Sequence, residues 1–212
     1  MKKIITFLFL SFLTLGVYAQ QCKTGNCQNG TGTFTWKNGD TYQGTFKNGN
    51  PDGQGVFKTS NGDTYEGSFV AGKFEGKGTY TFASGSKYVG DFKNGVKEGK
   101  GTFIFPNGDK YEGSYKNDKF EGQGTYTWKS GTKYQGEWKN GNKGGSGKIT
   151  YNNGATYEGE WSNNMRNGQG TYTTNNGNKQ VGEFVNDKFT NGTFIYKSDG
   201  SKVEYVNGFP KK

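Results

Sequence analysis

Few residues in this chain of 212 could carry out chemistry. Glu158 and Glu160 stand two positions apart, a pairing that could suggest the acid and base of a glycosidase. However, Glu66, Glu112 and Glu158 recur at equivalent positions of a repeat, with lysines nearby, so weak ion pairs on a solvent-facing surface are the better interpretation. The chain has no histidine, and no strand-to-helix turn is expected that could present a nucleophile. We therefore predict a protein that is not an enzyme and binds no cofactor.

One segment imitates a calcium loop. Asn48, Asn50 and Asp52 have the spacing of its first ligands, but Thr59 stands where a bidentate glutamate normally closes the site. The many Gly-x-Gly pairs are not phosphate loops either, because no helix is expected to follow them. We predict a turn at Asn48 and no metal site.

The first nineteen residues predict export. Lys2 and Lys3 precede an apolar run from Ile4 to Val17, and small residues stand before a cut after Ala19. The run is shorter than the ~20 apolar residues that a membrane-spanning helix needs. We expect a secretory signal peptide over 1–19 and no transmembrane segment after its cleavage. The destination would be the periplasm, the cell surface or the medium.

Cys22 and Cys27 are the only cysteines. Two thiols without histidine leave the usual four positions of a zinc site unfilled. Oxidising conditions outside the cytoplasm favour a local disulfide. We predict that these two cysteines pair and tie the N-terminal end of the fold.

The composition favours strands and turns over helices. All four leucines lie before residue 20, and the rest is rich in Gly, Thr, Tyr, Phe, Asn and Lys. A tyrosine recurs every 23 residues, with a glycine two positions later and an aromatic residue four positions later, which marks a stacked repeat. The residues that define this packing are Tyr42, Gly44, Phe46, Tyr65, Gly67, Phe69, Tyr88, Gly90, Phe92, Tyr111, Gly113, Tyr115, Tyr134, Gly136, Trp138, Tyr157, Gly159 and Trp161.

Each repeat predicts a β-hairpin with one aromatic and one polar face. Side chains alternate between the faces of a strand, so the tyrosine, the glycine and the second aromatic residue share a face. The glycine leaves space in which a ring from the adjacent strand can lie flat. Asn-Gly pairs favour the positive φ angles that close hairpins. They occur here at Asn48-Gly49, Asn94-Gly95, Asn107-Gly108 and Asn140-Gly141.

These residues resemble the MORN (membrane occupation and recognition nexus) repeats, whose units look like Tyr-x-Gly-x-Phe/Trp followed by Gly-x-Gly-Thr-Tyr. Residues 111–115 (Tyr-Glu-Gly-Ser-Tyr) and 122–126 (Gly-Gln-Gly-Thr-Tyr) are a close match, and the resemblance covers nearly all of 28–208. It implies an all-β fold: an elongated, single-layer antiparallel β-meander, a solenoid-like ribbon of tandem 23-residue hairpins. With the predicted leader, the chain is similar to an exported, bacterial-type member of the family.

The repeat pattern also sets the predicted domain bounds. Residues 20–41 would form an N-terminal cap and partial repeat, and 203–212 a C-terminal partial repeat or tail. Between them, 42–202 would hold seven repeats, of which the last has Gln180 in place of the tyrosine. The predicted starts are 42, 65, 88, 111, 134, 157 and 180.

The formal net charge is +9, but its distribution argues against nucleic-acid binding. Lysines supply almost all of the positive charge and are spread through turns and the polar face, while Arg166 is the only arginine. A solvated lysine-rich surface is the simpler interpretation.

Two function classes remain. The resemblance implies a scaffold or protein-interaction module whose partner is an exported or cell-envelope protein, or a second copy of the chain. The alternative is a surface module that binds cell-envelope polysaccharide or anionic phospholipid. Phe74 and Phe120 would contact such a ligand, because they are expected in inter-strand loops where Lys97, Lys143 and Arg166 hold the equivalent positions. Packing beneath the loop is the favoured explanation for these two rings.

Overall fold

The computed structural model describes residues 22–211, so the expected signal peptide lies outside the described part of the chain. The described residues form strands, turns and bends without a helix, and they fall into two compact units, 22–106 and 107–211. Within these residues there is accordingly no helix that could cross a membrane.

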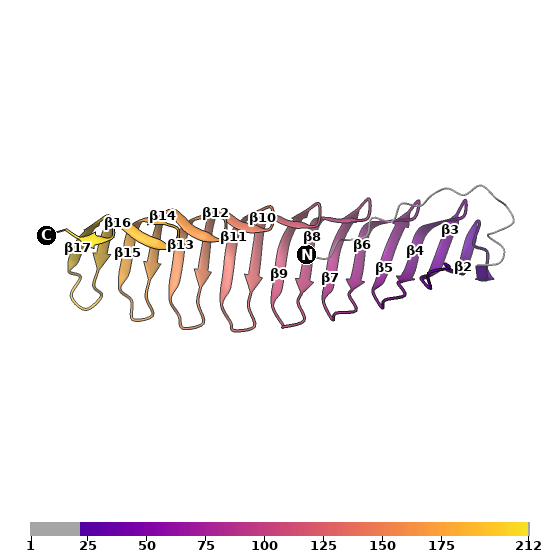
Figure 1. Ribbon diagram of the computed structural model, residues 1–212, viewed down its shortest axis with the longest axis horizontal. Coiled ribbons are helices and arrows are strands. Elements are labelled where there is room, and N and C mark those ends of the chain that lie inside the picture. The colour runs from indigo at the N-terminus through magenta and orange to yellow at the C-terminus, as the bar shows by residue number, and fades with distance from the viewer. Residues whose placement is uncertain (1–21, 212) are drawn as a thin grey trace. The chain divides into compact units, whose positions relative to one another are not determined.

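The first unit is a meander in which each strand pairs antiparallel with the next in sequence, as Figure 1 shows. Its strands are β1 (Cys22–Gly25), β2 (Gly30–Thr35), β3 (Thr41–Lys47), β4 (Asn50–Lys58), β5 (Thr64–Val70), β6 (Lys73–Thr81), β7 (Lys87–Lys93) and β8 (Val96–Ile104).

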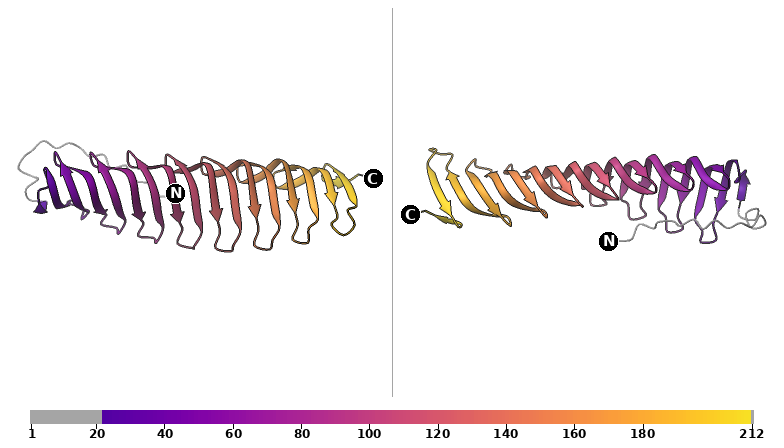
Figure 2. Two further views of the ribbon diagram at one scale, coloured as in Figure 1. Left: turned by 180° about the vertical axis from the view of Figure 1, so that it is seen from behind. Right: turned by 90° about the horizontal axis from the view of Figure 1, so that it is seen from above.

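The second unit repeats the same arrangement, seen from behind in Figure 2. Its strands are β9 (Lys110–Lys116), β10 (Lys119–Thr127), β11 (Lys133–Lys139), β12 (Asn142–Thr150), β13 (Thr156–Ser162), β14 (Met165–Thr173), β15 (Lys179–Val185), β16 (Lys188–Ile195), β17 (Lys202–Val206) and β18 (Phe209–Pro210). The predicted all-β, single-layer meander of tandem hairpins is therefore confirmed.

Two kinds of connection alternate between β2 and β16, while residues 26–29 join β1 to β2 and residues 196–201 join β16 to β17. Two-residue turns join the strands of a hairpin, as at Asn140 and Gly141, which have φ of 51° and 87°. Five-residue connections join successive hairpins, as at 36–40, where the Trp36 N–H donates to the Asp40 carbonyl over 2.9 Å. The predicted turn pair Asn107-Gly108 belongs to this longer kind, because it lies inside the gap between Ile104 and Lys110.

The strands of each hairpin shift register beyond their paired glycines. Gly136 pairs with Gly147, but the next aligned pair is Trp138 with Lys143, so the strand of Lys143 holds extra residues. One of these, Gly145, has a φ of 65°, which an L side chain rarely adopts. This bulge lets the turn end of the hairpin fold over the aromatic face.

The bulge explains why Phe74 and Phe120 do not lie where the sequence predicts them. The sequence predicts both in inter-strand loops, yet each is the second residue of a strand, β6 and β10 respectively. The prediction failed because the turns hold only two residues and the glycines after each phenylalanine form a bulge within the strand, as at Phe120 and Gly124.

The core lies on the aromatic face. Six repeat tyrosines are 0 % exposed, and they are accompanied by the second aromatic residue of each motif. The buried tyrosines are Tyr42, Tyr65, Tyr88, Tyr111, Tyr134 and Tyr157.

Candidate functional site

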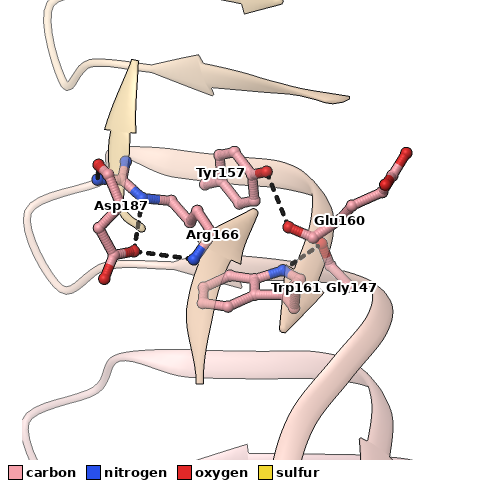
Figure 3. Close-up of polar contacts among 6 residues, drawn as sticks. All are labelled: Gly147, Tyr157, Glu160, Trp161, Arg166 and Asp187. Atoms are coloured by element: carbon pink, nitrogen blue, oxygen red, sulfur yellow. Dashed lines mark hydrogen bonds and ion pairs between the residues drawn. The ribbon is translucent and has the colours of Figure 1, made fainter. Parts of the chain in front are cut away.

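The repeat tyrosine is held at both ends of its ring. The Tyr134 hydroxyl donates to the Glu137 carbonyl over 3.0 Å, and its ring lies flat above Gly147 of the facing strand. Figure 3 shows the same hydrogen bond between Tyr157 and Glu160. The remaining four repeat tyrosines each donate to the carbonyl three residues later, in Thr45, Ser68, Asp91 and Ser114.

Aromatic rings of the same repeat and of the next repeat pack against each tyrosine. Tyr134 meets Trp138 of its own repeat and Trp161 of the next one edge to face, with ring centroids 5.3 and 5.2 Å apart. The Trp161 indole also donates to the Gly147 carbonyl over 3.1 Å (Figure 3). Burial raises the pKa of Tyr42 and of Tyr157 to about 12, so these hydroxyls stay protonated donors.

Phe74 and Phe120 cover this row from the turn side. Phe74 stacks on Tyr65 with centroids 3.8 Å apart, and Phe120 stacks on Tyr111 at 3.6 Å. Both phenylalanines are half-buried. Their contacts with the repeat tyrosines account for their presence without a ligand.

At the equivalent position other repeats place a cation over the tyrosine. The Lys143 ammonium lies 5.5 Å from the Tyr134 centroid and 4.3 Å from that of Trp161. Burial lowers the pKa of Lys143. Arg166 lies 5.5 Å from the Tyr157 ring and pairs with Asp187 at 3.1 Å, as Figure 3 shows. The repeat period aligns Lys143 and Arg166 with Phe74 and Phe120, but the sequence pattern does not indicate that these cations cover the rings.

Cys22 and Cys27 are bonded to each other, with a Cα–Cα distance of 6.0 Å. Cys22 opens β1, and Cys27 is buried in the turn before β2. Within residues 22–211 no group of three or more His, Cys, Asp or Glu side chains is placed to hold a metal ion. The Asn48 segment is a hairpin turn, and the Asp52 carboxylate accepts the Ala71 N–H over 3.1 Å.

The polar face of the second unit carries a shallow hollow of about 760 Å³ across β10–β15. The main chain of the glycine pairs forms part of its floor, and polar side chains stand around it. Its lining consists of Gln123, Gln135, Gly136, Glu137, Ser146, Gly147, Lys148, Glu158, Gly159, Glu160, Gln169, Gly170, Thr171, Val181 and Gly182.

Glu158 and Glu160, the acids considered in the sequence, both belong to this hollow. Glu158 pairs with Lys148 at 3.0 Å, the kind of ion pair that is expected on a solvent-facing surface. The Glu160 side chain points away from the Tyr157 ring (Figure 3). Alternation alone places these side chains on one face, but it does not predict that the face is hollow. The hollow is thus the candidate functional site that sequence reasoning missed.

Comparison with known proteins identifies the repeat. The MORN repeat model matches seven successive segments, 28–41, 42–64, 65–87, 88–110, 111–133, 134–156 and 157–179. The chain belongs to the MORN repeat family. MORN repeats are scaffold or interaction folds, which is the functional class that the family supports. Residues 180–202, with Gln180 at the tyrosine position, lie outside the matched segments.

Three solved structures show a limited similarity to this chain. The TCP10 domain of Danio rerio CPAP is 12 % identical, with 81 % of each chain covered and a TM-score of 0.48. The TCP10c domain of Drosophila melanogaster Sas-4 is 15 % identical over 73 % of this chain and 93 % of that one, with a TM-score of 0.43. The Drosophila melanogaster SAS-4 TCP domain in complex with a proline-rich motif of Ana2 is 15 % identical. The match covers 96 % of this chain and 100 % of that one, with a TM-score of 0.37. No curated protein matches the MORN chain.

Proposed function

We propose that this MORN protein is an exported, non-enzymatic scaffold that docks a segment of another exported or cell-envelope protein in the hollow across β10–β15. The hollow is the observation that carries the proposal. The aromatic face is filled by the chain's own rings, whereas the hollow is lined by five glycines and by polar side chains such as the exposed Gln135. A repeated surface of this kind suits an extended polypeptide better than a small molecule.

A side chain that fills the hollow tests the docking surface. Gln135 lies exposed on β11 and lines the hollow, while Gln43 holds the equivalent place on β3, four repeats earlier. The chain from residue 20 onward, immobilised, would be incubated with the exported fraction of the producing cell. We expect Gln135→Trp to retain a partner polypeptide at least ~10-fold more weakly than wild type, equivalent to ~1.4 kcal/mol, and Gln43→Trp to match wild type.

Two outcomes would overturn this function. Equal retention by all three proteins would show that the hollow is not the docking surface. Retention of polysaccharide or phospholipid with no polypeptide would instead support the alternative binding class.

Export itself is tested by sequencing the N-terminus of the protein recovered outside the cytoplasm. Cleavage by a signal peptidase after Ala19 would leave Gln20 as the first residue. A protein that keeps Met1 and stays in the cytoplasm would contradict the proposed location.

A further inference from the structure

The hollow has the opposite charge to the chain that carries it. Its lining holds Glu137, Glu158 and Glu160 against Lys148, a formal charge of −2, whereas the whole sequence is formally +9. A cationic segment would therefore be attracted to the hollow and repelled by much of the remaining surface.

The same place in the first unit lacks this charge. Four repeats earlier, Thr45 and Ser68 stand at the positions of Glu137 and Glu160. The ten side-chain positions that line the hollow correspond there to one acid and one base, Glu66 and Lys77, for a formal charge of zero. Since the strands and their glycine pairs are equivalent in the two places, the fold does not require the negative charge of the hollow.

The two extra carboxylates stand on alternate strands. Glu137 lies on β11 and Glu160 on β13, with β12 between them, so a spacing of ~4.8 Å per strand puts them ~10 Å apart along the sheet. One of them is also held in place, since the Glu137 Oε1 atom accepts the Ser146 N–H over 3.1 Å. Three residues of extended chain span ~10 Å, so basic side chains three residues apart would match both carboxylates.

We propose that the hollow binds an extended partner segment rich in lysine or arginine, with basic residues at about three-residue intervals. The inference rests on the proposed docking function and adds the chemistry of the partner. Glu137 and Glu160 would each pair with one basic side chain, and the segment would run across the strands from β11 to β13.

A labelled peptide with four Lys-Gly-Gly units tests this chemistry by fluorescence anisotropy on the chain from residue 20 onward. We expect binding that weakens between ~50 and ~150 mM salt, as exposed charge pairs do. Glu137→Thr with Glu160→Ser should weaken it at least ~10-fold. Both substituents already occur at the equivalent positions Thr45 and Ser68, so this variant should fold.

The matched control removes two carboxylates outside the hollow. Glu66→Gln with Glu112→Gln changes the net charge equally and introduces the residue that other repeats carry at Gln43 and Gln135. The affinity of this control for the lysine peptide should stay within ~2-fold of wild type, a much smaller change than the tenfold loss expected for the hollow variant.

Three results would overturn the inference: no binding of the lysine peptide, equal binding by all three proteins, or equal binding of a peptide in which glutamate replaces lysine. Failure of the proposed function is a separate result. Suppose that Gln135→Trp retains a polypeptide of the exported fraction more weakly than wild type, but the lysine peptide does not bind. The proposed docking function would then be upheld, and only the basic chemistry of the partner would be wrong.

Discussion

At the residue scale, the repeat depends on a tyrosine ring that occupies the space of a missing side chain. A Cβ atom on Gly147 would lie 2.6 Å from Cζ and 2.7 Å from Cε2 of Tyr134. The ring cannot move aside, because Trp138 and Trp161 enclose it. Glycine is therefore needed here because the Tyr134 ring leaves no space for a Cβ atom. Glycine has a low strand propensity, and burial of the ring offsets that cost.

We predict that Gly147→Ala lowers the free energy of unfolding by ~2–3 kcal/mol through overpacking. Gly144→Ala on the same strand is the control, because its Cβ would meet only Lys139 Cβ at 3.6 Å. Urea unfolding, followed by circular dichroism, measures both. Equal midpoints for the two variants would refute the ring-over-glycine explanation.

At the element scale, the two-residue turns require a left-handed first residue. Asparagine supplies it in most hairpins, as at Asn94 and Asn140, each with φ of 51°. Ala71 takes the same position with φ of 46°. An alanine side chain cannot form the hydrogen bond by which asparagine offsets the strain of a left-handed backbone. Ala71 is therefore less suited to this turn position than the asparagines of the other hairpins.

Ala71→Asn should raise the free energy of unfolding by ~0.5–1 kcal/mol, because asparagine adopts positive φ more readily. The Asp52 carboxylate would keep its hydrogen bond, since the donor is the main-chain N–H of residue 71. Asn140→Ala is the reciprocal variant and should be destabilising by a similar amount. An Ala71→Asn protein that unfolds at lower urea would contradict this account.

At the scale of the whole molecule, buried carboxylates join successive repeats within each unit. Asp109 accepts the Lys129 N–H over 2.8 Å and the Tyr126 hydroxyl over 2.9 Å, and it is only 8 % exposed. In the first unit, Asp40 accepts the Ser60 N–H in the same way. Stability in repeat proteins comes largely from such contacts between neighbours, so these links should make the fold sensitive to acid.

The pKa of Asp109 lies below its ordinary 3.8, chiefly because the Lys129 N–H donates to the carboxylate. Since folding lowers this pKa, the ionised carboxylate contributes stability above its unfolded pKa, which is lost as pH falls through the folded value. We predict that Asp109→Asn costs ~1 kcal/mol at pH 7 and that the difference from wild type shrinks below about pH 4.

Urea unfolding from pH 7 to pH 2 tests the aspartate link. The variant should still fold, because Asn178 holds the equivalent position and accepts the Lys197 N–H over 3.0 Å. Glu112→Gln, which removes an exposed carboxylate of the same unit, is the control for the loss of one acidic side chain. A constant gap between Asp109→Asn and wild type at every pH would reject the linkage.

The sequence by itself determined the hairpins, their two faces and the tyrosine-over-glycine packing. These follow from alternation along a strand and from a 23-residue period, both of which can be read along the chain. Only the tertiary structure decided that Phe120 and Lys143 share a role as ring covers, that Asp109 links two repeats, and that Glu137 and Glu160 lie in a hollow. Each of these depends on residues that the fold brings together from separate strands or connections, which local pattern does not specify.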